Sequence, residues 1–304
     1  MAEKDHIKNP AEWVMDEVKA AGRALGSADQ NLRHPGEAGS AEHLRVRQIK
    51  VSDLGEALSK GFSDFGACRS DVVFICVVYP LAGLFLVRMA FGYELLPLLF
   101  PLLSGFALIG PLAAIGLYEI SRRREAGDKV KWSAAFGVLR APGLVSIVAL
   151  GVILLITFFF WLLSAHIIYL LTLGPEPPSS FAGFFTEVLT TLPGWIMIAL
   201  GCGIGFCFAL LVLMISVVSF PLLIDHNVGL GTAISTSIQA VLSNPLPMAV
   251  WGLIVSGALI VGSLPALAGL IIVMPVLGHA TWHLYRKVVS FNPPAASEDW
   301  SPSI

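Results

Sequence analysis

The chain has 304 residues and a formal net charge of -2; 56% of the residues are hydrophobic and only 13% are charged. Soluble domains carry about 25% charged residues, so this composition excludes an ordinary soluble globular protein. No Lys or Arg occurs between Ala141 and Tyr285, a stretch that a bilayer can accommodate and water cannot. The sequence therefore predicts an all-α, polytopic integral membrane protein.

Polar segments are predicted at both ends of the chain. Residues 1–45 are expected to form a polar, partly disordered cytoplasmic region, since "GSADQNLRHPGEAGSAE" has the composition of a flexible linker. No apolar core follows Met1, so no signal peptide is expected. Residues 46–289 are predicted to form the membrane domain, and residues 290–304 a disordered tail.

Six apolar segments are long enough to cross a bilayer. They are about Val72–Gly92, Leu95–Tyr118, Gly143–Leu173, Pro193–Ile224, Met248–Ser263 and Leu264–Tyr285. The last two could instead form one span plus a re-entrant piece. Basic residues gather between the second and third spans, while the loop of residues 174–192 has none. The positive-inside rule then places both termini in the cytoplasm.

A threefold repeat is visible in the apolar pattern. Each pair of spans is preceded by an amphipathic segment of the kind that lies in the membrane interface. The apolar positions of the three segments are Leu54, Leu58, Phe62 and Phe65; Trp132, Phe136 and Leu139; and Leu230, Ile234 and Ile238. The second span of each pair carries a proline: Pro111, Pro221 and Pro275. We expect three repeats of interfacial helix plus hairpin, with chance similarity within an apolar chain as the alternative.

The stretch "GHATWHLYRK" holds the strongest candidate site. His279 and His283 are four residues apart and share a helix face, and with His226 they could hold a haem or a metal ion. The same stretch is typical of a helix leaving a membrane, so the sequence also predicts interfacial anchors there. These anchors are Trp282, Tyr285, Arg286 and Lys287.

Other polar or small residues suggest packing rather than chemistry. Gly201 and Gly205 form a GxxxG face that favours close helix contact, and Glu119, just before three arginines, is expected to be solvated. The sequence contains no Ser-His-Asp set, paired catalytic carboxylates, HExxH or phosphate loop. We therefore predict no catalytic residue, no metal and no cofactor, and no nucleic-acid binding, because the basic residues follow membrane topology.

Three stretches carry a resemblance to a known family. "LLSGFALIGPLAAIGLYEISRRREAG", "SVVSFPLLIDHNVGLGTAISTSIQAVLSNP" and "GHATWHLYRKVV" resemble an uncharacterised family of bacterial integral membrane proteins. Its members are often labelled as cytochrome c oxidase subunit I. The resemblance covers roughly Val46 to Val289 and implies an inner-membrane location without an established activity.

These observations favour a non-enzymatic structural, assembly or interaction protein. Its expected partners are the lipid bilayer and either other membrane proteins or a second copy of the chain. One alternative is a haem- or metal-binding accessory protein of the respiratory chain that uses His279, His283 and His226. The other is a carrier of an uncharged or lipid-like substrate, because the centres of the spans are apolar with small residues.

Overall fold

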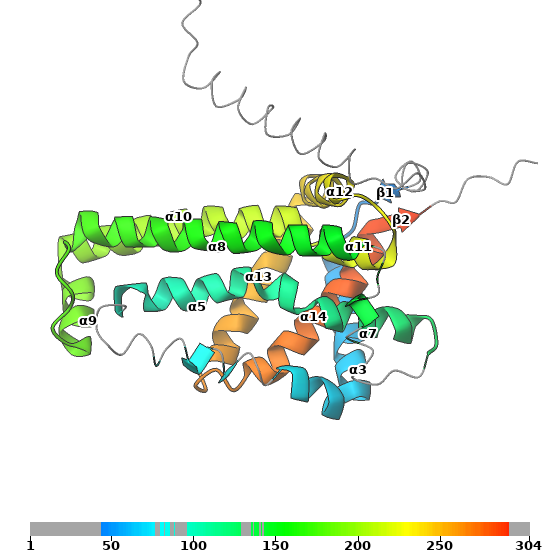
Figure 1. The fold of residues 1–304 in the computed structure, drawn as a ribbon, viewed down its shortest axis with the longest axis horizontal. Helices are drawn as coiled ribbons and strands as arrows, with labels where there is room; N and C mark the ends of the chain where they lie inside the picture. The colour runs from blue at the N-terminus through cyan, green and yellow to red at the C-terminus, as the bar shows by residue number, and fades with distance from the viewer. Residues whose placement is uncertain are drawn as a thin grey trace, which may run out of the picture.

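The computed structural model describes residues 44–76, 80–81, 83–85, 88, 96–128, 135, 137–139, 141 and 143–291. Almost all of its regular structure is helical (Figure 1). The helices are α3 (Val51–Cys76), the 3-10 turn η1 (Leu96–Leu98), α5 (Leu99–Leu108), α6 (Gly110–Ala113), α7 (Ile115–Glu125), α8 (Leu144–Thr172), α9 (Phe181–Thr190), α10 (Leu192–Ser216), α11 (Ser219–Asp225), α12 (Leu230–Ser243), α13 (Pro245–Ser263) and α14 (Leu270–Val288). Two short strands, β1 (Leu44–Val46) and β2 (Val289–Phe291), frame this series.

Within the described residues, three helical segments are long and apolar enough to cross a membrane. They are Leu144–Thr172, Leu192–Asp225 and Pro245–Ser263, close to the third, fourth and fifth predicted spans. Helices α8 and α10 lie side by side along the long axis of the molecule, with α9 at one end, while α13 and α14 run obliquely to them (Figure 1). This architecture agrees with an all-α membrane protein.

The second predicted span is a broken helix. Helix α5 ends before Ile109, α6 is only one turn long, and α7 continues to Glu125, seven residues beyond the predicted end at Tyr118. Pro111 lies in the first turn of α6, where a residue without a backbone N–H interrupts the hydrogen bonds of the preceding helix. The charged residues after Tyr118 thus remain helical beyond the predicted end of the span.

The first predicted span begins inside a helix that starts earlier. Helix α3 joins the predicted interfacial segment to residues 72–76 without interruption, so that segment is not a separate helix. The rest of the predicted span, residues 77–92, lies largely outside the described residues. The third interfacial segment is a separate helix, α12, and Trp132 and Phe136 of the second are not described. The threefold repeat and the count of six spans therefore stay predictions.

The last apolar stretch forms two helices and not one. Helices α13 and α14 are separated by a turn over residues 264–269. Ala266 and Leu267 adopt φ angles of 49° and 66°, the left-handed conformation that reverses a chain direction and that side chains with a Cβ rarely adopt. The turn therefore separates two helices, while the alternative of two spans or one span plus a re-entrant piece stays open.

Helices α3 and α14 cross at very short range. A Cβ built on Gly61 of α3 would lie 2.7 Å from both the Cβ and the backbone N of Ala280 in α14. On the neighbouring face of α14, a Cβ on Gly278 would lie 2.6 Å from Cδ1 of Leu117 in α7. The absence of these side chains lets α14 pack against both helices, and it places the polar residues of all three in contact.

Candidate functional site

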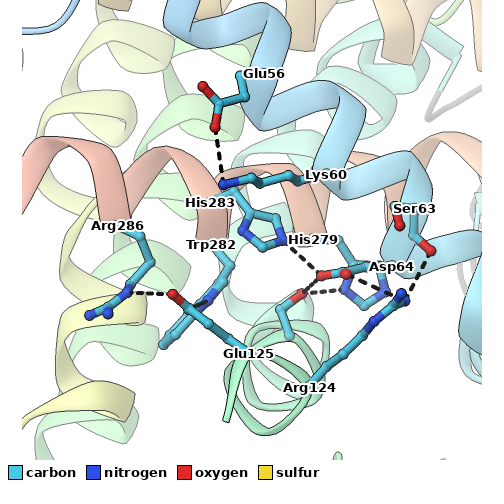
Figure 2. A network of polar contacts seen from close by, with 11 residues as sticks. Glu56, Lys60, Ser63, Asp64, Arg124, Glu125, His279, Trp282, His283 and Arg286 are labelled. Atoms are coloured by element: carbon cyan, nitrogen blue, oxygen red, sulfur yellow. Dashed lines mark hydrogen bonds and ion pairs between the residues drawn. The ribbon is translucent and has the colours of Figure 1, made fainter. Parts of the chain in front are cut away.

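A buried polar cluster lies where α3, α7 and α14 meet (Figure 2). We define it as Asp64, Ser121, Arg124, His279 and His283. Oδ2 of Asp64 lies 2.6 Å from the hydroxyl of Ser121 and 2.8 Å from Nε2 of His283. Nδ1 of His279 lies 2.8 Å from the same Ser121 hydroxyl, and Arg124 lies 3.4 Å from the other oxygen of Asp64. The cluster links three helices through one carboxylate.

The hydrogens of the cluster can be assigned from its donors and acceptors. An ionised carboxylate only accepts, so Ser121 and Nε2 of His283 both donate to Asp64. The single hydroxyl proton of Ser121 is then used, and Nδ1 of His279 must donate to the Ser121 oxygen. In the neutral ring this leaves a lone pair on Nε2 of His279. Nε2 is the one fully buried side-chain nitrogen or oxygen of the described residues without a hydrogen-bond partner.

The charge of Asp64 is maintained by these contacts. Burial raises the pKa of the Asp64 carboxyl, but the hydrogen bonds from His283 and Ser121 outweigh it, so the pKa lies below its ordinary value of 3.8. Asp64 is 6% exposed and His279 is fully buried. A buried carboxylate is tolerated when donors satisfy it in this way; the cluster is therefore anionic at Asp64 at neutral pH.

A second set of contacts continues from the cluster toward α11. Glu125 of α7 accepts hydrogen bonds from the indole N–H of Trp282 (2.9 Å) and from Nε of Arg286 (3.2 Å), as Figure 2 shows. Asp225 of α11 accepts from the Tyr285 hydroxyl at 2.8 Å and from Arg286 at 3.2 Å. Successive turns of α14 are thus tied to α7 and α11.

The predicted interfacial anchors are only partly placed as expected. Trp282 and Tyr285 are each 1% exposed, which leaves no ring surface for lipid headgroups, so the prediction for these two residues is corrected. Their polar atoms bind carboxylates of neighbouring helices, which explains why they are buried. Arg286 and Lys287 keep part of their surface, although Lys287 pairs with Asp53 and Glu56 of α3.

Glu119 is also buried and not solvated. It is 3% exposed, and its carboxylate receives hydrogen bonds from Nε of Arg122 at 2.7 Å and from Nε of Arg123 at 2.6 Å. The two arginines supply the charge that such a buried carboxylate requires. The acidic residue before an arginine run thus serves as their shared partner.

The structure brings together two of the three predicted cofactor histidines. His279 and His283 share the cluster, whereas His226 pairs with Asp225 at 3.3 Å and stacks on Phe291 with ring centroids 4.7 Å apart. Within the described part of the chain, no group of three or more His, Cys, Asp or Glu side chains could hold a metal ion. Nε2 of His279 is the buried lone pair of the cluster that no described donor occupies.

The two glycines of the predicted packing face differ in their surroundings. A Cβ on Gly205 would lie 2.9 Å from the indole of Trp161 in α8, whereas a Cβ on Gly201 would meet nothing within 4 Å. Gly205 therefore lies at the α8–α10 contact within one chain. The role of Gly201 in contact with another helix stays a prediction.

Comparison with curated proteins and with solved structures gives no match. Residues 99–225, from α5 to the end of α11, match the family described as "Predicted integral membrane protein (DUF2189)", which confirms the predicted resemblance to an integral membrane family of unknown function.

Proposed function

We propose that this chain is a non-enzymatic protein of the bacterial inner membrane that acts as a structural, assembly or interaction component. In this proposal it has six spans and both termini lie in the cytoplasm. The basic residues Arg122, Arg123 and Arg124 lie at the end of α7, whereas α9 and the loop without Lys or Arg lie at the opposite end of α8 and α10 (Figure 1). This separation of charge supports the orientation.

The observation that carries the proposal is that the buried carboxylates bind donors of the chain itself. Asp64, Glu119 and Asp225 are each held by donors from the chain itself, so their contacts stabilise the junction of α3, α7, α11 and α14. A large part of the surface that remains for partners is apolar. Only 33% of the most apolar stretch of α8 is buried. Helices α8 and α10 expose large side chains such as Phe159, Phe206 and Leu171. Such faces bind lipid chains and apolar partner helices.

A pull-down of the full chain in gentle detergent, followed by mass spectrometry, tests this function. We expect at least one membrane protein to co-purify at a stoichiometric level with the wild type. The matched control is Phe159→Ala/Phe206→Ala, which removes exposed apolar surface from the proposed partner faces of α8 and α10. Proteins captured equally by both chains do not bind through these faces. A wild type with no partner above that background would contradict the proposal.

The free Nε2 of His279 favours one second candidate, a haem- or metal-binding accessory protein. An imidazole with Nδ1–H bound to a neighbouring oxygen is the usual form of a histidine ligand. We expect, if this candidate holds, a Soret band or a stoichiometric metal in the purified wild type that is lost in His279→Ala and kept in His166→Ala. A wild type without either signal would remove the candidate and leave His279 as a packing residue.

A further inference from the structure

A short basic segment is fixed to the membrane domain by main-chain contacts. We call residues 44–50, "LRVRQIK", the basic strap. Strand β1 at its start pairs antiparallel with β2, and the Arg47 N–H donates to the Val288 carbonyl at 2.7 Å. Asn244, between α12 and α13, accepts from the Ile49 N–H at 2.7 Å and donates to the Arg47 carbonyl at 3.0 Å. The strap is thereby held against the α12–α13 corner.

The three cations of the strap differ from Arg124 and Arg286 in their surroundings. Arg124 and Arg286 bind carboxylates, whereas Arg45, Arg47 and Lys50 are exposed and have no side-chain partner among the described residues. Arg45 and Arg47 are two positions apart, so along an extended segment they point to the same side. The strap therefore presents fixed positive charge that no side-chain ion pair of the described residues neutralises.

Exposed apolar side chains flank the attachment point of the strap. Leu242 and Leu246 are each 66% exposed and lie on either side of Asn244. Pro245 begins α13, one of the helices long and apolar enough to cross a membrane. The end of such a helix lies at the depth of the headgroups, which is where the strap is attached. Cations beside exposed leucines are typical of a surface in contact with anionic lipid.

We propose that the basic strap and the neighbouring leucines form a binding surface for the headgroups of anionic phospholipids. Arg45, Arg47 and Lys50 contact the headgroup phosphates, and Leu242 and Leu246 lie against the acyl chains. A bilayer lipid fits better than a soluble anion, because a soluble ligand would leave both leucines in water. The surface is independent of the polar cluster and of any protein partner.

Lipid retention by the purified full chain tests this surface. The protein is exchanged into mixed micelles with equal phosphatidylglycerol and phosphatidylcholine, and the lipids retained after gel filtration are counted by mass spectrometry. We expect the wild type to enrich phosphatidylglycerol and Arg47→Gln/Lys50→Gln to reduce that enrichment by at least about fivefold. The charge-matched control Lys60→Gln/Arg88→Gln, which changes two exposed cations elsewhere, should keep it.

Three outcomes would overturn the proposal. They are a wild type without enrichment, an unchanged ratio in the strap variant, and an equal loss in the control, which would show an effect of net charge alone. Excess inorganic phosphate should not displace the retained lipid; displacement would show that the site binds soluble phosphate. If the double variant does not purify, the single variant Arg47→Gln gives the same test, since the Arg47 side chain is exposed and makes no ion pair with the described residues.

Discussion

Replacing Gly61 with alanine is expected to destabilise the protein by about 2–3 kcal/mol. The new Cβ would lie 2.7 Å from the backbone N of Ala280 and 2.9 Å from its Cα. A backbone atom cannot move aside as the end of a side chain can, so α3 and α14 must separate. Separation also lengthens the bonds from Asp64 to Ser121 and His283. Thermal or denaturant unfolding in a mild detergent measures the change.

Two other glycines of α3 provide the matched control. A Cβ on Gly55 or on Gly66 would meet nothing within 4 Å, and alanine is favoured over glycine inside a helix by roughly 0.5–1 kcal/mol. We therefore expect Gly55→Ala and Gly66→Ala to be neutral or stabilising, the opposite sign to Gly61→Ala. A similar loss of stability in all three variants would show that α3 and α14 do not cross at Gly61.

The buried face of α3 shows where the apolar pattern misleads. Hydrophobic spacing indicated a face through Leu54, Leu58, Phe62 and Phe65. Leu54 is buried and Leu58 and Phe65 pack against the core, but Phe62 is 57% exposed. The face in contact with α14 instead carries Ala57, Gly61 and Asp64. Small residues permit close contact and an acidic residue satisfies donors across it. A hydrophobicity pattern gives no weight to either property.

The long apolar helices were predicted well because hydrophobicity alone determines them. In α8, α10 and α13 nearly every position is apolar, so composition and length alone determine a helix that can span a bilayer. Helix α10 begins beside Pro193, and α13 begins at Pro245 and ends just before the turn at Ala266. Proline and turn residues of this kind are the signals by which local sequence rules predict helix ends. These helices do not depend on a distant partner.

The candidate site depends on distant partners, and that is why sequence reasoning found only two of its five residues. His279 and His283 share a face at fixed helical spacing, which the sequence shows. In the chain, Asp64 lies 215 residues from His279, and Ser121, which is hydrogen-bonded to His279, lies 158 residues from it. No local sequence pattern connects residues so far apart. Trp282 and Tyr285 were assigned to the interface because the carboxylates that bury them lie on α7 and α11.

Removing the Asp64 carboxylate is expected to have the largest effect in the polar cluster. Asp64→Ala leaves Ser121, His283 and Arg124 without their acceptor in a buried site, which should cost about 3–5 kcal/mol. Asp64→Asn keeps one oxygen for Ser121 and His283 but loses the charge, and charge-assisted bonds are roughly twice as strong as neutral ones. We therefore expect Asp64→Asn to lower the free energy of unfolding by about half as much as Asp64→Ala.

Glu56→Gln serves as the control for Asp64, because it removes the same charge from the same helix at an exposed position. It should leave the unfolding transition unchanged. An equal effect of both substitutions would mean that overall charge, and not the buried contacts, stabilises the junction of α3, α7 and α14.

The pH dependence of the Asp64 effect gives an independent test of the same contacts. The pKa of the folded carboxyl lies below its ordinary value of 3.8 because donors outweigh burial. Its stabilising contribution is therefore complete above pH 3.8 and is lost as the pH falls through the lower, folded value. The stability difference between the wild type and Asp64→Asn should be constant near neutral pH and shrink below pH 3.8. A difference that shrinks well above that pH would show that Asp64 is protonated earlier, and that Ser121 and His283 do not hold its charge.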